Sequence, residues 1–208
     1  PADRKDGLDM LRISDPVRFA KVMMGRSFHT DGRHLGGIAV RGFKLFPEHA
    51  RNVYDWALDH PSVRIVHLYR DNLLAEFSSY RVAMRDGHWV GGPDSTQRLR
   101  ILFDRDRFLR FVDMKQRYLE NLRGRLASRA APSIDIEYSQ IARSSVNRVL
   151  SFLLDEPVDA PVSALGLKQQ LNERVIERFV NPDEVLACLA EIGQAQWAGV
   201  EMPEVDRL

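Results

Sequence analysis

The chain has 208 residues, of which 44% are hydrophobic and 28% are charged, and its formal net charge at pH 7 is +1. This length and apolar content fit a single globular domain with a core of ordinary size. A protein that binds nucleic acid in general usually carries a clear basic excess, so the near-neutral charge argues against that class.

The cysteine count and the hydropathy limit where the protein works. Cys188 is the only cysteine, so no disulfide can form within the chain and a reducing cytoplasm fits best. Because it falls on the apolar side of a predicted helix, we expect it in the core. No apolar run reaches the roughly 18 residues that a membrane-spanning helix needs, so we predict no transmembrane segment.

The first third of the chain predicts one strand between helices. Asp15-Pro16 is typical of a helix start, because proline is favoured at the first helical position. The apolar run Ile38–Phe46 predicts a buried strand. Pro47 then opens a helix with one apolar face, and Pro61 closes it.

The middle of the chain predicts a second strand that leads into a helix. Val63–Tyr69 is apolar and bounded, as a buried strand is. Asp71 or Asn72 starts the helix that follows, and Asp71 can cap it. A glycine-rich loop over 87–93 comes next. Phe108–Leu122 then predicts a strongly amphipathic helix.

The last third adds one more strand and two helices. Ile134–Tyr138 predicts a third strand, and Ser144 or Ser145 starts a helix that ends near Leu154. After a loop-like stretch, Asn181-Pro182 combines a capping residue with a proline in the first helical turn. This alternation predicts an α/β fold with a mostly parallel sheet, in which ligands bind at the carboxyl ends of the strands.

The turn after the second strand has the features of a phosphate site. Arg70 stands at the carboxyl end of the strand, and Ser78 follows eight residues later, on the same side of the next helix. A helix N-terminus offers free N–H groups, and an arginine can bind a phosphate with two hydrogen bonds. From spacing alone a simpler alternative stays open. In that alternative Arg70 pairs with Asp71 or a nearby carboxylate, and Ser78 is only a small packing residue.

The stretch LYRDNLLAEFSSY, residues 68–80, resembles the 3′-phosphate-binding segment of sulfotransferases that use PAPS (3′-phosphoadenosine-5′-phosphosulfate). Within that family, the chain resembles the bacterial nodulation or trehalose type. The resemblance covers roughly residues 38–192 and implies a P-loop-like parallel sheet flanked by helices. Its other motifs are Gly42–Phe46 with His49, Ala83 with Gly87–Trp89, Ile136–Tyr138 with Phe152–Leu154, Lys168–Gln170 and Asn181–Leu186.

This resemblance implies transfer of a sulfuryl group from PAPS to a carbohydrate or glycolipid hydroxyl, with no metal. A loose His-Asp-His grouping in the glycine-rich stretch before residue 38 is too weak to assign a metal site. The residues that we expect to act fall into four roles. Arg70 and Ser78 hold the 3′-phosphate, Lys168 and Gln169 approach the nucleotide, Lys44 stabilises charge with His49 or Glu48 as base, and His88 and Trp89 bind the acceptor.

One expected motif is missing from the sequence. Sulfotransferases carry a Gly/Ser-rich loop for the 5′-phosphosulfate after their first strand, and no such loop or GxxxxGK[ST] run occurs here. Because the chain opens on Pro1, we expect residues 1–208 to be one sulfotransferase-like domain that lacks this strand and loop. A non-catalytic protein of the same fold and a P-loop-like small-molecule kinase are the alternatives, and a homodimer stays open.

Overall fold

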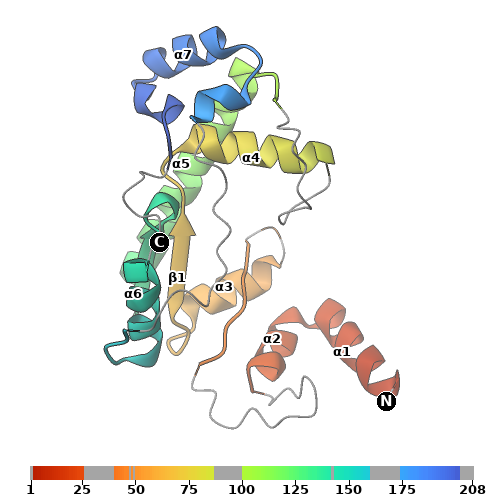
Figure 1. The fold of residues 1–208 in the computed structure, drawn as a ribbon. Coiled ribbons are helices and arrows are strands. Elements are labelled where there is room, and N and C mark those ends of the chain that lie inside the picture. Colours follow the sequence, from red (N-terminus) through yellow and green to blue (C-terminus); the bar gives the residue numbers. More distant parts are fainter. Residues whose placement is uncertain are drawn as a thin grey trace. The chain divides into compact units, whose positions relative to one another are not determined.

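The structure is a computed structural model, and it describes residues 2–25, 40–46, 48, 50–86, 100–141, 143–159 and 174–201. The chain divides into two compact units, and Figure 1 labels their helices and strands. Unit 1 comprises Pro1–Val66, Arg125–Ile134 and Val149–Val158, and unit 2 comprises His67–Gly124, Asp135–Arg148 and Asp159–Leu208.

The described residues form one small sheet, which is parallel and has helices beside it. Its two strands are β1 (Ile65–Tyr69) and β2 (Ser133–Glu137). Both coincide with predicted strands to within two residues, because each is a short apolar run bounded by turn residues. The mixed helix and strand class is therefore confirmed.

The strand predicted at Ile38–Phe46 is wrong over its described part. Residues 40–46 form neither a helix nor a strand and pair with no strand among the described residues. Phe43 and Phe46 expose 48% and 43% of their surface, so the apolar run is not buried there. A run of this kind becomes a strand only where a neighbouring strand completes its backbone hydrogen bonds.

The described residues of unit 1 include three complete helices, α1 (Ala2–Ser14), α2 (Pro16–Gly25) and α3 (Arg51–Asp59). The predicted start of α2 is confirmed, since the Asp15 carboxylate accepts a 2.9 Å hydrogen bond from the Arg18 N–H. Helix α3 begins later than Pro47, which lies outside the described residues. It buries Val53, Tyr54, Ala57 and Leu58.

Unit 2 is built mainly from helices around an aromatic core. The Phe77 and Phe108 rings meet edge to face at 5.4 Å, and Phe103 meets Phe179 at 5.7 Å. Burying each such side chain contributes about 1.5–3 kcal/mol before the loss of conformational entropy. Its elements, two of which continue into unit 1, are α4 (Leu73–Asp86), α5 (Arg105–Ser128), η1 (Tyr138–Gln140), α6 (Arg143–Leu154), η3 (Val175–Arg178), α7 (Pro182–Glu191) and η4 (Ala195–Ala198).

Asn181 does not cap α7 as the sequence predicts, although the helix does begin at Pro182. Its side-chain oxygen accepts from the Phe103 N–H at 2.8 Å, and its side-chain nitrogen donates to the Phe103 carbonyl at 3.1 Å. The amide therefore satisfies both backbone groups of Phe103 in the way a neighbouring strand would. Phe103 is only 2% exposed, so its backbone groups need hydrogen-bond partners within the protein. This need outweighs the preference of Asn181 for capping the helix.

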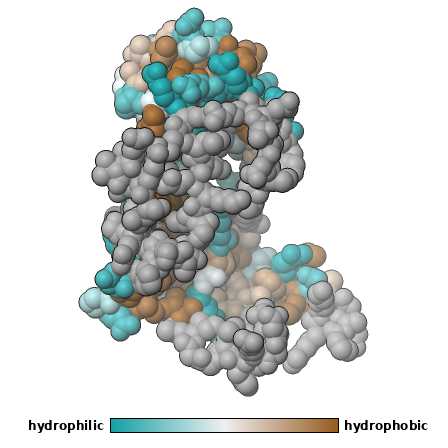
Figure 2. All heavy atoms as spheres, in the orientation of Figure 1, coloured by the Kyte–Doolittle hydropathy of each residue, from teal (hydrophilic) through white to brown (hydrophobic). Residues whose placement is uncertain are grey.

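Cys188 is 2% exposed in the core of unit 2, which confirms its predicted place. None of the described helices is both long and apolar enough to span a bilayer. Figure 2 shows hydrophilic and hydrophobic side chains mixed over α7, as expected for a helix with one buried and one solvated face.

Candidate functional site

The turn between β1 and α4 is fixed at both ends by side-chain hydrogen bonds. The Asn72 side-chain oxygen accepts from the Ala75 N–H at 2.9 Å, so Asn72 caps α4, and not Asp71 as predicted. The Asn72 side-chain nitrogen donates to the Trp197 carbonyl at 3.0 Å. One amide thus ties the start of the helix to the buried Trp197 of η4.

The carboxyl ends of β1 and β2 are joined by the buried carboxylate of Glu137. It accepts from the Asp71 N–H at 3.1 Å and from the N–H and hydroxyl of Ser139. Partial burial, and secondarily the negative charge of Glu137, raise the pKa of Asp71 above its usual value. These bonds fix the backbone next to Arg70.

Arg70 is nearly buried and has three partners. Its guanidinium makes a two-pronged ion pair with Glu201, and the two side chains are only 11% and 8% exposed. It also donates to the Ser79 hydroxyl at 3.2 Å and lies 4.6 Å from the centre of the Tyr138 ring. The carboxylate pairing foreseen as the simpler alternative is therefore present, with Glu201 as the partner in place of Asp71.

Ser78, in α4, is fully buried and contacts a second arginine, Arg178. It is 1% exposed, donates to the Ala75 carbonyl at 2.8 Å and accepts from Arg178 at 3.1 Å. Burial and the neighbouring positive charge of Arg70 lower the pKa of Arg178. In this conformation Ser78 positions Arg178, and its direct contact with a phosphate stays a prediction.

We call this group the anion cluster: Arg70, Ser78, Ser79, Arg178 and Glu201. It contains two guanidinium groups and one carboxylate, which pairs with Arg70, so the cluster keeps one net positive charge in a poorly solvated place. Charge-assisted hydrogen bonds are strong in such surroundings, which suits the cluster to a small anion. Sequence reasoning missed Arg178 and Glu201, because neither belongs to a motif near Arg70.

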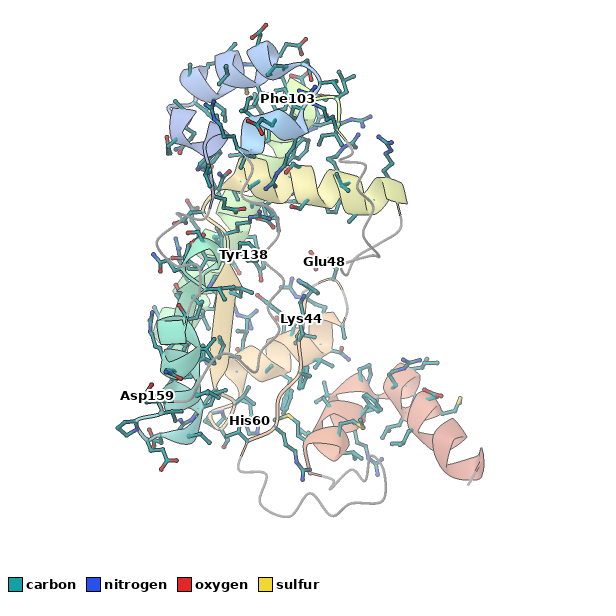
Figure 3. The ribbon with its side chains drawn as sticks, in the orientation of Figure 1. Lys44, Glu48, His60, Phe103, Tyr138 and Asp159 are labelled. Atoms are coloured by element: carbon teal, nitrogen blue, oxygen red, sulfur yellow. The ribbon has the colours of Figure 1, made fainter. Side chains whose placement is uncertain are left out.

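A pocket of about 210 Å³ opens beside the anion cluster. Arg70 lines it, whereas Ser78 and Arg178 do not. Three tyrosine rings give it flat apolar walls, and Lys115 and Glu76, which form a 2.6 Å ion pair, add one positive and one negative group. The three tyrosines are Tyr69, Tyr118 and Tyr138, and the remaining walls come from His67, Leu68 and Leu119. Figure 3 labels Tyr138 near the tip of the β1 arrow.

Of the other predicted site residues, Lys44 and Glu48 belong to unit 1, whereas Arg70 and Ser78 belong to unit 2. Lys44 and Glu48 are exposed, on the stretch before α3 (Figure 3). The Lys44 ammonium lies 4.6 Å from the centre of the Phe46 ring. The predicted residues outside the described ranges are His49, His88, Trp89, Lys168 and Gln169.

The described residues contain no group of three His, Cys, Asp or Glu side chains that could hold a metal ion. Comparison with family models, with curated proteins and with solved structures finds no match for this chain. The case for a function therefore depends on the anion cluster and on the sequence resemblance.

Proposed function

We propose that the chain is a sulfotransferase that moves a sulfuryl group from PAPS to a carbohydrate or glycolipid hydroxyl. The observation that carries the proposal is the partly buried pair of Arg70 and Arg178 at the carboxyl end of β1. Ligands of parallel sheets bind at this end. The resemblance of the segment that contains Arg70 supplies the identity of the ligand.

In this proposal the 3′-phosphate of the nucleotide binds the two guanidinium groups. Tyr138 fixes the plane of the Arg70 guanidinium from one side, and Ser79 holds one of its nitrogens at 3.2 Å. Ser78 holds Arg178 in the same way at 3.1 Å. Because these contacts are made before a ligand arrives, little side-chain freedom is lost on binding.

The transfer step requires an acceptor oxygen in line with the sulfur and the 5′-phosphate oxygen. The acceptor oxygen bonds to sulfur, the bond between sulfur and the 5′-phosphate oxygen breaks, and the acceptor proton passes to a base. We propose His49 or Glu48 as this base and Lys44 as the group that stabilises developing charge. Adenosine 3′,5′-bisphosphate is then the second product.

Further proposed roles depend on the resemblance alone. Lys168 and Gln169 would contact the nucleotide, and His88 and Trp89 would bind the acceptor, where an indole ring can pack against a sugar face. The same resemblance supports the proposal that the chain has a P-loop-like parallel sheet flanked by helices. A base at His49 predicts that His49→Ala abolishes transfer and leaves nucleotide binding unchanged.

Calorimetry with adenosine 3′,5′-bisphosphate tests the binding part of the proposal. Removing a buried two-pronged phosphate contact costs on the order of 2–4 kcal/mol, so Arg70→Ala should weaken binding at least about thirtyfold. Arg105→Ala is the matched control, because Arg105 makes an exposed ion pair with Glu191. Arg70→Lys separates the loss of charge from the loss of the two-pronged geometry.

Two results would count against this function. If the native protein fails to bind the bisphosphate, or if it binds no better than Arg70→Ala, the anion cluster is not the nucleotide site. Binding without transfer of labelled sulfate to any carbohydrate acceptor would instead favour a non-catalytic protein of the same fold.

A further inference from the structure

The anion cluster already holds an anion, which is the carboxylate of Glu201. Both Glu201 oxygens face the Arg70 guanidinium, the geometry in which arginine binds a carboxylate or a phosphate. Glu201 is also 131 positions from Arg70 in the chain, so the pair is a tertiary contact and not a local turn. A phosphate needs the same face of Arg70.

We propose that Glu201 is an internal competitor for the anion cluster, and that a phosphate ligand binds only by displacing its carboxylate from Arg70. This inference rests on the proposed function, because it concerns regulation of the same site. The affinity of the protein for its nucleotide is then set partly by how often Glu201 leaves Arg70.

Charge explains why a phosphate monoester can displace Glu201. With Glu201 in place the cluster still has one net positive charge, since it contains two arginines and one acid. A phosphate monoester carries about −1.5 to −2 charge near pH 7 and has three acceptor oxygens. It can therefore neutralise both guanidinium groups, whereas the hydrogen bonds that Glu201 accepts from the described residues all come from Arg70.

The chain before Glu201 is held by the buried Trp197 and, nearer the acid, by an isolated antiparallel bridge between Arg174 and Val200. Trp197 is 9% exposed, and its carbonyl accepts the hydrogen bond from Asn72. Beyond it, Gly199 accepts a 2.9 Å hydrogen bond from the Val175 N–H, and Val200 is 49% exposed. Among the described residues, withdrawal of Glu201 would therefore break its ion pair with Arg70 and disturb the bridge at Val200, and Glu201 is not one of the residues that form the core of unit 2.

The Val175 amide reports on this movement. Its hydrogen bond to Gly199 lies within the segment that would move with Glu201, while Val175 itself is fully buried. An amide whose partner withdraws exchanges its hydrogen faster. If Glu201 is displaced on binding, ligand should speed exchange at Val175, although ligands usually slow exchange across a protein.

The test is calorimetry of adenosine 3′,5′-bisphosphate with the native protein, Glu201→Gln and Glu201→Asp. We expect Glu201→Gln to bind about tenfold tighter. This factor corresponds to a native protein in which Glu201 is paired with Arg70 in roughly nine-tenths of the molecules. Glu201→Asp keeps the charge with a shorter reach and should lie between the two. Glu191→Gln is the matched control, because it removes the same charge from an exposed pair.

The alternative is that Glu201 holds Arg70 in place for the ligand. Glu201→Gln would then bind more weakly than the native protein, and exchange at Val175 would slow on adding the bisphosphate. Weaker or equal binding by Glu201→Gln overturns the inference and leaves the proposed function standing. If neither the native protein nor Glu201→Gln binds, the proposed function fails and the inference fails with it.

Discussion

Ser78 and Arg178 are joined by a 3.1 Å hydrogen bond, although 100 positions separate them in the chain. Ser78 belongs to α4 and Arg178 to η3, so the contact brings a second arginine to the helix that follows Arg70. Arg178 carries a lowered pKa because it is buried and lies near Arg70. Two like charges held close in this way are costly unless an anion neutralises them.

The first prediction is that Arg178→Ala weakens binding of adenosine 3′,5′-bisphosphate. Hydrogen bonds to charged groups contribute about 1.5–3 kcal/mol, so the dissociation constant should rise roughly tenfold to a hundredfold. Ser78→Ala removes only the group that positions Arg178, and its effect should be smaller. Calorimetry measures both.

Arg107→Ala supplies the control for this comparison, because Arg107 pairs with Asp104 on an exposed surface. It should bind like the native protein. If Arg178→Ala binds as tightly as Arg107→Ala, the second arginine has no part in the site.

The second prediction concerns Asn72, which caps α4 and donates to the Trp197 carbonyl. Loss of a helix cap costs about 0.5–2 kcal/mol, and each kcal/mol lowers the melting temperature of a chain of this size by about 2–4 °C. Asn72→Ala should therefore melt several degrees lower. Asn72→Asp keeps the capping oxygen, loses the donor to Trp197 and should fall between. Asn121→Ala, at an exposed position within α5, is the control and should not lower the melting temperature.

The local part of the fold could be predicted from the sequence. The starts of α2 and α7 and both strands of the sheet follow from patterns of five to ten residues. The run over 40–46 has a similar apolar pattern and forms no strand. Pattern alone cannot tell whether a neighbouring strand will be present, because backbone pairing is a long-range contact.

The candidate site shows the same limit. Arg70 and Ser78 could be named because they share one short segment with a recognisable spacing. Arg178 and Glu201 could not, because their contacts depend on how η3 and the stretch after η4 pack against α4. Asn181 shows the same limit in a different way. Its sequence context predicts a helix cap, but its side-chain oxygen instead accepts a hydrogen bond from the Phe103 N–H.

The third prediction is a pH-dependent effect of Asp71. Partial burial and the charge of Glu137 raise the pKa of Asp71, so the folded protein holds the proton more tightly than the unfolded chain. The free energy of unfolding then falls as the pH rises from about 3.9, the usual value for aspartate, through the raised pKa. Asp71→Asn removes this penalty and should be more stable than the native protein at pH 7.

Urea unfolding at two pH values measures this effect. The advantage of Asp71→Asn should shrink as the pH falls towards 4, because the native carboxyl becomes neutral as well. An equal advantage at both pH values would mean that the charge of Asp71 is not the cause. A less stable variant at pH 7 would show that the carboxylate makes a favourable contact.

The fourth prediction is that Cys188 is unreactive while the protein is folded. The thiol is 2% exposed, and burial raises its pKa, so both access and the reactive thiolate form are suppressed. Iodoacetamide at pH 7 should label the native protein far more slowly than the protein in urea, and the rate should follow opening of the core around α7. Since the chain has one cysteine, all of the label that is measured is attached to Cys188. Labelling as fast as in urea would place Cys188 at the surface and contradict the core of unit 2.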